Sequence, residues 1–227
     1  MRHVLDAAKV RRYATISRVL SFGGMGIMGI GLVVSFRQST RLDGVLGLFL
    51  AGMIASQLGI PMRNRWDRRP RIDELLDRAL KGLDGRFSIF HYSLGASHVV
   101  ICPAGIFALL PRFDDGEVEY QDGKWVRTVQ KRGRLRRGGI RRIDGLDRQA
   151  AAEADRLQRR LARKLGEAQI PPVDPLVVFL NAAAEIRPDG APTRAVHLKK
   201  LKDTLRRLPK AQTLSESQVS LLAGGPN

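Results

Sequence analysis

The chain is poor in the residue types that build disulfides and metal centres, because its 227 residues include one cysteine and four histidines. The single thiol, Cys102, excludes an intrachain disulfide and a zinc site made of several cysteine thiolates. No two histidines have the spacing of a zinc-binding helix of the H-E-x-x-H type. We therefore predict neither a metal centre nor a bound cofactor.

Acidic residues are also scarce. The chain has 22 Asp and Glu against 39 Lys and Arg, which leaves a formal net charge of +17. A chain this basic is expected to bind an anionic partner, either phospholipid headgroups or nucleic acid.

Charge is missing altogether from two stretches near the N-terminus, residues 19–36 and 44–62. At about 1.5 Å per residue, a helix over either stretch would cross about 27–29 Å, close to the hydrocarbon thickness of a bilayer. Five Lys and Arg precede the first stretch, two lie between the stretches and five follow the second. This bias predicts a two-span protein of the inner membrane with both termini in the cytoplasm. The predicted residues of the membrane–water interface are Arg63, Arg65, Trp66, Arg68 and Arg69.

Small residues follow helical spacing in both spans, with Ala51, Ala55 and Gly59 in the second and Gly31 and Ser35 in the first. Such faces let helices approach closely, so the spans are expected to pack on each other or on another membrane subunit. A signal peptide is disfavoured because a second apolar span follows the first. A buried soluble hairpin is disfavoured because neither span has a polar face.

The remaining sequence predicts an α/β domain, which divides the chain into a basic N-terminal segment (1–18), a transmembrane hairpin (19–62) and a cytoplasmic domain (63–227). An apolar stripe predicts a helix over 71–83, and apolar runs predict strands at 98–102 and 106–110. Asp122-Gly123 predicts a hairpin turn between strands 117–120 and 125–129. Further helices are expected at 146–165, 198–208 and 215–222, and strands at 175–181 and 195–198. This order predicts a mixed sheet flanked by helices.

Several motifs of this domain resemble those of the nuclease-related domain family called NERD. They are the run H-V-V-I-C-P-A-G-I-F-A-L-L at 98–110, the helix with Gln149, the strand ending V-V-F-L-N, and a C-terminal L-x-x-x-Q segment. The resemblance covers residues 71–222 and implies a restriction-endonuclease-like fold. In that group one carboxylate precedes the first core strand, and a carboxylate and a lysine lie two residues apart on the next. Together they hold Mg²⁺ and activate water.

The residues at the corresponding positions of this chain are Ser97, Leu110 and Arg112. Leucine cannot bind a metal ion and arginine does not act as a base at neutral pH, so the resemblance implies a degenerate nuclease site. The main alternative is a nuclease with rearranged acids, drawn from Asp114, Asp115, Glu117 and Glu119, which requires two carboxylates close together near Arg112. His91 and His98 could serve as general bases, but no nucleophile lies in a recognisable motif beside them.

The densest positive charge lies in residues 124–142, which contain no acidic residue. Arginine donates paired hydrogen bonds to phosphate, so this segment predicts an anion-binding arm for nucleic acid or for lipid headgroups. A solvated loop is the simpler alternative.

The function predicted from the sequence is a membrane-anchored, non-catalytic binding or accessory module, with a structural subunit of a membrane assembly as a further alternative. The candidate anion-binding residues are Lys131, Arg132, Arg134, Arg136, Arg137, Arg141 and Arg142.

Overall fold

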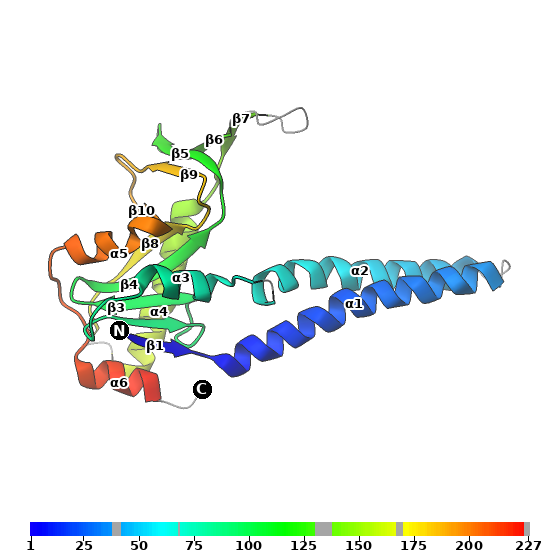
Figure 1. Ribbon diagram of the computed structural model, residues 1–227, viewed down its shortest axis with the longest axis horizontal. Coiled ribbons are helices and arrows are strands. Elements are labelled where there is room, and N and C mark those ends of the chain that lie inside the picture. Colours follow the sequence, from blue (N-terminus) through cyan, green and yellow to red (C-terminus); the bar gives the residue numbers. More distant parts are fainter. Residues whose placement is uncertain (38–41, 68, 130–137, 167–169, 225–227) are drawn as a thin grey trace. The chain divides into compact units, whose positions relative to one another are not determined.

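A computed structural model describes residues 1–37, 42–67, 69–129, 138–166 and 170–224. The chain forms two compact units, one containing Met1–Leu5 with Asp73–Asn227 and the other containing Asp6–Ile72. The first unit is α/β, and the second is a helical hairpin (Figure 1). The segment expected to be a basic N-terminal extension (1–18) therefore contains a strand of the α/β unit and the beginning of the first hairpin helix.

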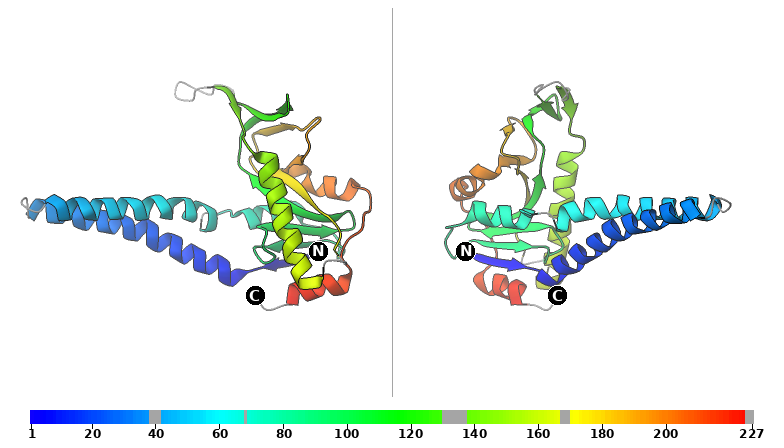
Figure 2. Two further views of the ribbon diagram at one scale, coloured as in Figure 1. Left: turned by 180° about the vertical axis from the view of Figure 1, so that it is seen from behind. Right: turned by 45° about the vertical axis from the view of Figure 1, so that its right-hand side comes forward.

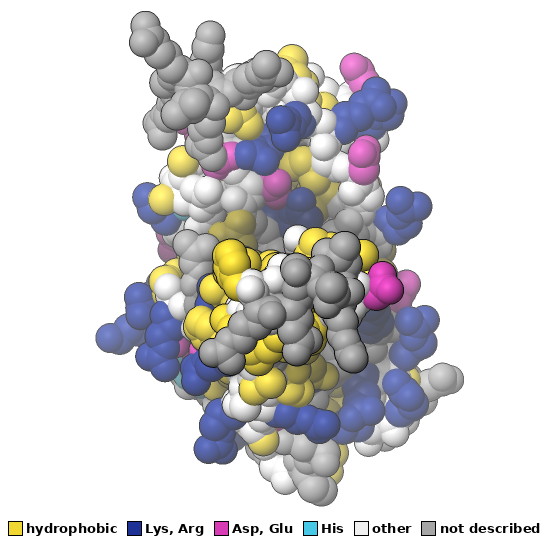
Figure 3. All heavy atoms as spheres, turned by 90° about the vertical axis from the view of Figure 1, so that its right-hand side faces the viewer, with side chains coloured by type: hydrophobic (Ala, Val, Ile, Leu, Met, Phe, Trp, Pro, Cys, Tyr) yellow, Lys and Arg dark blue, Asp and Glu magenta, His cyan; other side chains and the backbone are white. Residues whose placement is uncertain are grey.

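The hairpin consists of α1 (Ala7–Arg37) and α2 (Leu42–Trp66). Both helices are long and apolar enough to cross a membrane, and most of each apolar stretch is exposed. Figure 3 shows hydrophobic side chains crowding the hairpin surface, whereas Lys and Arg are spread over the visible surface of the α/β unit. Core helices of a soluble domain would bury these side chains, so exposure favours a lipid environment.

The two helices pack along a seam in which a buried residue recurs every seven positions. The seam leaves no room for side chains at its centre: a Cβ on Gly52 would lie 2.6 Å from the carbonyl oxygen of Gly24. Such close backbone approach is what small residues allow in membrane helices. The seam residues with this spacing are Val10, Ser17, Gly24 and Gly31 in α1, and Val45, Gly52, Gly59 and Trp66 in α2. Ser21 of α1 is also buried in the seam, against Gly59.

The small-residue faces expected from the sequence coincide only partly with this seam. Gly31 and Gly59 lie in the seam, whereas Ala51 and Ser35 are exposed and Ala55 is half-buried. The repeat that packs the hairpin has a period of seven residues rather than four, as in left-handed helix pairs.

The described strands of the α/β unit form two sheets. The six-stranded sheet has the order β1 (Arg2–Leu5), β2 (Ser88–His91), β3 (His98–Cys102), β4 (Gly105–Arg112), β8 (Val173–Phe179) and β10 (Arg194–His197). Strands β2, β3 and β4 form an antiparallel meander, and the β1–β2, β4–β8 and β8–β10 pairs are parallel. The four-stranded sheet has the order β7 (Gly139–Arg142), β6 (Lys124–Val129), β5 (Gly116–Gln121) and β9 (Ala184–Arg187).

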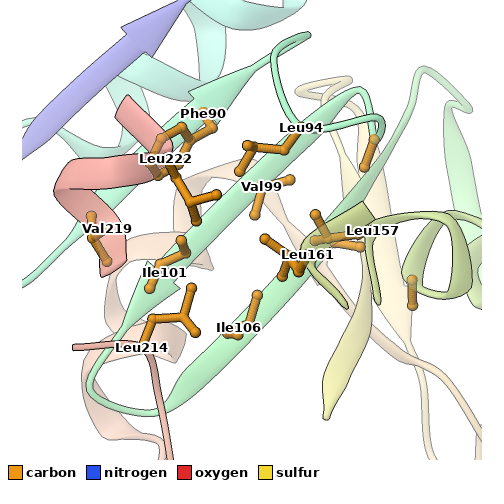
Figure 4. Close-up of a cluster of buried hydrophobic side chains, with 13 residues drawn as sticks. Phe90, Leu94, Val99, Ile101, Ile106, Leu157, Leu161, Leu214, Val219 and Leu222 are labelled. Carbon is orange, nitrogen blue, oxygen red and sulfur yellow. The ribbon is translucent and has the colours of Figure 1, made fainter. Parts of the chain in front are cut away.

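Four helices accompany the described sheets: α3 (Ile72–Leu80), α4 (Leu146–Leu165), α5 (Leu198–Arg207) and α6 (Glu216–Gly224). Helix α4 crosses one face of the six-stranded sheet, as seen from behind in Figure 2. Leu157 and Leu161 of α4, and Val219 and Leu222 of α6, point into a core with side chains of β2, β3 and β4 (Figure 4). These burials explain the apolar stripe of 146–165, whose predicted bounds are confirmed.

Local sequence signals account for other elements. Asp122 and Gly123 both have positive φ angles, 49° and 74°, as the predicted two-residue hairpin turn requires. The amide of Ser215 donates to the side-chain oxygen of Gln218 at 2.9 Å, and the Gln218 amide donates to the Ser215 hydroxyl at 3.3 Å. This reciprocal capping begins α6 where the sequence predicted a helix.

Candidate functional site

The positions that the nuclease resemblance identifies lie at one end of β3 and β4. His98 of β3 pairs with Leu109 of β4, so Ser97 and Leu110 are the next residues along the two strands. Arg112 is the last residue of β4. The antiparallel register therefore places Ser97 beside Leu110, two residues before Arg112.

Leu110 is half-buried and lies at the edge of an apolar cluster. It packs against a cluster that includes Val118, Trp125, Val177 and Phe179. In the parallel register with β8, Leu110 lies opposite Val177. An ionised carboxylate at this position would lose part of its hydration among aliphatic and aromatic side chains, which is costly without a partner charge. The position is thus built for packing.

The acids that could have formed a rearranged nuclease site are paired with arginine. Asp114 accepts a hydrogen bond from Arg112 Nε at 2.9 Å and lies 3.6 Å from an Arg127 nitrogen. The same Arg127 guanidinium forms an ion pair with Asp115.

Arg187 pairs with Glu117 at 2.7 Å and with Glu119 at 3.0 Å. Within the described part of the chain, no group of three or more His, Cys, Asp or Glu side chains could hold a metal ion.

The residues of the predicted anion-binding arm are described only in part. Arg141 and Arg142 are exposed on β7, an outer strand of the four-stranded sheet, where Arg142 pairs with Val126 and Arg141 with Arg127. Lys131, Arg132, Arg134, Arg136 and Arg137 lie outside the described residues.

The predicted interface residues cluster at the end of α2. Trp66 is buried and stacks on Tyr13 of α1 with ring centroids 4.9 Å apart, so its ring closes the base of the hairpin. Arg63 lies over the Phe22 ring and Arg65 over the Trp66 ring. Arg69 is exposed, and Arg68 lies outside the described residues.

Helices α4 and α5 carry further exposed positive charge that the sequence analysis did not single out. Arg159 and Arg163 line an open groove of about 700 Å³ along α4, together with Gln158 and Ala162. In α5, Lys202 and Arg206 donate to the carbonyl oxygens of Lys81 and Gly82 at 2.5 and 3.2 Å, just after α3. Three further cations of α5 are exposed: Lys199, Lys200 and Arg207.

The most unusual polar cluster of the α/β unit joins three of the four histidines to one carboxylate. His91 of β2 and His98 of β3 are buried cross-strand partners whose Nδ1 atoms lie 2.7 Å apart. The Nε2 atom of His91 lies 3.1 Å from Asp77 of α3, and His3 of β1 reaches the same carboxylate oxygen at 2.7 Å. Four elements thus contribute to one hydrogen-bonded chain.

Electrostatics fix the donors of this chain. Burial raises the pKa of Asp77, but the hydrogen bonds from His91 and His3 outweigh burial and hold the pKa below its ordinary value. An ionised Asp77 only accepts hydrogen bonds, so His91 carries a proton on Nε2. The backbone beside the cluster is strained, because Tyr92 has a φ of 62° and its ring packs edge-on against His98.

Sequence reasoning missed this cluster, although it considered His91 and His98 singly. The signal was present in the antiparallel pairing of 88–91 with 98–101, which makes His91 and His98 direct neighbours.

Comparisons with family models, curated proteins and solved structures found no match.

Proposed function

We propose that the chain is a membrane-anchored, non-catalytic binding module whose α/β domain is a nuclease-related domain of the NERD kind. The observation that carries this proposal is the packing of the half-buried Leu110 against an apolar cluster, at the position where the resemblance places a metal-binding acid. The order of elements supports the fold assignment: a helix, the β2–β3–β4 meander, then α4 and the parallel strand β8. The domain would then retain the scaffold of a nuclease without its chemistry.

The site of action that we propose is the cytoplasmic face of the inner membrane. The Lys and Arg bias of the sequence supports this orientation. The hairpin is inserted between β1 and α3, so the domain is covalently attached to it at two points. Such attachment keeps the domain within reach of lipid headgroups.

The partner that we propose is an anionic phospholipid surface. Exposed cations on α4, α5 and β7 support it, since each Lys or Arg near an anionic membrane contributes on the order of 1 kcal/mol. The described basic surface also suits nucleic acid, whose phosphates would be bound with steep salt dependence and little sequence preference.

The test uses the full chain in nanodiscs of neutral lipid and in nanodiscs containing an anionic lipid. Hydrogen exchange of the α4 and α5 peptides should be slower in the anionic discs. Replacing Arg159 and Arg163 with glutamine should abolish that difference for α4, whereas the control Arg156→Gln should leave it in place, because Arg156 pairs with Glu153 outside the groove. Equal exchange in both discs, together with tight binding of duplex DNA or RNA to the neutral discs, would identify nucleic acid as the partner instead.

The nuclease alternative is tested with the same samples. We expect no cleavage of DNA or RNA with Mg²⁺ or Mn²⁺. Cleavage that disappears in Asp114→Asn or Asp115→Asn, and persists in Glu185→Gln as an acidic control, would show that a rearranged site is active.

A further inference from the structure

The α/β unit contains a cavity of about 560 Å³ at the β1 edge of the six-stranded sheet. Its floor is a row of side chains across three strands, because Arg2 of β1 pairs with Ser88 of β2, and Ser88 pairs with Ile101 of β3. Residues paired directly across a sheet project from the same face. The volume lies within the range of small-molecule sites, which is about 300–1,000 Å³.

The walls come from the segment between α5 and α6 and from the first turns of α6. Leu214 and Val219 of this part line the cavity and join Ile101 in the apolar core (Figure 4). The amide of Ala211 donates to the carbonyl oxygen of Pro103 at 3.0 Å, which ties the segment to the turn between β3 and β4. The reciprocal capping of α6 fixes its first turn. The walls of the cavity are therefore preformed.

Two hydroxyl groups of the lining lack a hydrogen bond within the described part of the chain. Ser88 has 5% of its surface exposed, and its side chain has no hydrogen-bond partner among those residues. The hydroxyl oxygen of Thr213 is buried and likewise has none. Buried polar groups in native proteins are almost always paired, because an unpaired one is unfavourable. A ligand with hydrogen-bonding atoms would supply the missing partner.

The charges of the lining cancel, although the whole chain has a formal net charge of +17. The charged lining residues are Arg2, Arg86, Asp84 and Glu216. Arg86 pairs with Asp84 at 2.6 Å. Arg2 donates to Ser220 at 3.0 Å, one helical turn after Glu216. A ligand charge of either sign would therefore be attracted by one of Arg2 and Glu216 and repelled by the other. The lining favours a ligand without charge.

We propose that this cavity binds an uncharged small molecule with a mainly apolar body and an amide or hydroxyl group that bonds to Ser88. The apolar body lies against Ile101, Leu214 and Val219. The cavity shares no residue with the groove of α4 or with the degenerate nuclease positions. Its ligand is thus tested separately from the proposed function.

The probe is benzamide, which joins an apolar ring to an uncharged amide. Benzoate and benzylamine carry the same ring with a negative and a positive group at neutral pH. Methyl NMR of the full chain in nanodiscs of neutral lipid follows Ile101, Leu214 and Val219, each assigned by its own substitution. We expect benzamide to shift these signals saturably, and both charged probes to bind more weakly. No saturable shift with benzamide, or equal or tighter binding of either charged probe, would overturn the proposal.

Ser88→Ala tests the hydrogen bond to the ligand. Losing it should raise the dissociation constant of benzamide roughly three- to tenfold. Ser93→Ala is the matched control, since the Ser93 hydroxyl is also buried without a partner among the described residues but does not line the cavity; it should bind benzamide as the wild type does. An unchanged constant in Ser88→Ala, or equal weakening in both variants, would contradict the proposal. Should Ser88→Ala fail to fold, Thr213→Trp fills the cavity from a half-buried position and must abolish binding.

Discussion

At the scale of single residues, Leu110 is an apolar side chain at the strand position where the proposed nuclease relationship would place a metal-binding acid. A carboxylate there would have to be surrounded by ligands and solvent, whereas the leucine side chain joins the core around Trp125 and Val177. Trp125 is itself held by a hydrogen bond from its indole nitrogen to Asp147 at 2.9 Å. The strand end is therefore a packed junction between the two sheets and α4.

Leu110→Asp tests this reading of the strand end. Partly burying a carboxylate without a partner should cost about 1–2 kcal/mol, which for a domain of this size corresponds to roughly 2–8 °C in the unfolding temperature. Thermal unfolding in one detergent, with and without Mg²⁺, measures the effect. Leu110→Met, which conserves volume, should change little. Full stability of the aspartate variant would show that the packing of Leu110 contributes nothing, and rescue of its stability by Mg²⁺ would show that the strand end can bind a metal ion.

Asp77 predicts a specific loss of stability in acid. Its pKa in the folded chain lies below the unfolded value of about 3.8, so its stabilising contribution is fully present above that value. The contribution is lost as the pH falls through the folded pKa, where protonation removes the acceptor of His3 and His91. Chemical unfolding of the wild type and Asp77→Asn between pH 5 and pH 2 should therefore show a difference in stability that shrinks toward the acid end. A constant difference would mean that the carboxylate charge contributes nothing.

At the scale of elements, the sequence predicted those with strong local signals. The helix at 146–165 has an apolar stripe over its whole length, and the strand at 98–102 is continuously apolar; both are confirmed with their bounds. Strands β1, β7 and β9 were not predicted, because each has only four residues and at most two of them alternate as apolar positions. Only their neighbours in the sheets define them.

The candidate sites also differ in how far the local sequence predicts them. The meeting of Ser97 and Leu110 follows from one hairpin, so a local motif sufficed to place them. The histidine cluster depends on contacts between residues 3, 77, 91 and 98, which belong to four elements. No local sequence pattern predicts these contacts, although the pairing of β2 with β3 already places His91 beside His98.

The hairpin seam offers a matched pair of glycines for a test. In Gly52→Ala the new Cβ would clash with the Gly24 carbonyl and with Met28, whereas in Gly47→Ala it would meet open space. We expect Gly52→Ala to separate the helices and lower the temperature at which the protein aggregates in detergent, and Gly47→Ala to behave as wild type. Equal behaviour of the two variants would show that the seam does not hold the hairpin together. Loss of an oligomer in Gly47→Ala alone would instead favour the structural-subunit alternative, with the outer face of α2 as its contact.

At the scale of the whole molecule, the proposed function depends on which side of the membrane holds the domain. Two spans with a short connection require both flanking segments to lie on one side. The basic residues that flank the two uncharged stretches, 19–36 and 44–62, favour the cytoplasm for that side. A domain on the opposite side would face the outer leaflet or the periplasm, where the proposed partner surface would be a different one.

The single cysteine makes this orientation measurable. Cys102 is buried, and burial raises the pKa of its thiol, so it should react slowly with maleimides in the folded protein. Asp43→Cys places a thiol at the exposed start of α2, beside the loop, and Lys210→Cys places one on the exposed surface of the α/β domain. In spheroplasts, a membrane-impermeant maleimide should label Asp43→Cys directly. It should label Lys210→Cys only after the membrane is permeabilised, and the wild type is the unlabelled control. The reverse pattern would place the domain outside, and labelling of both sites without permeabilisation would show that the hairpin does not span the membrane.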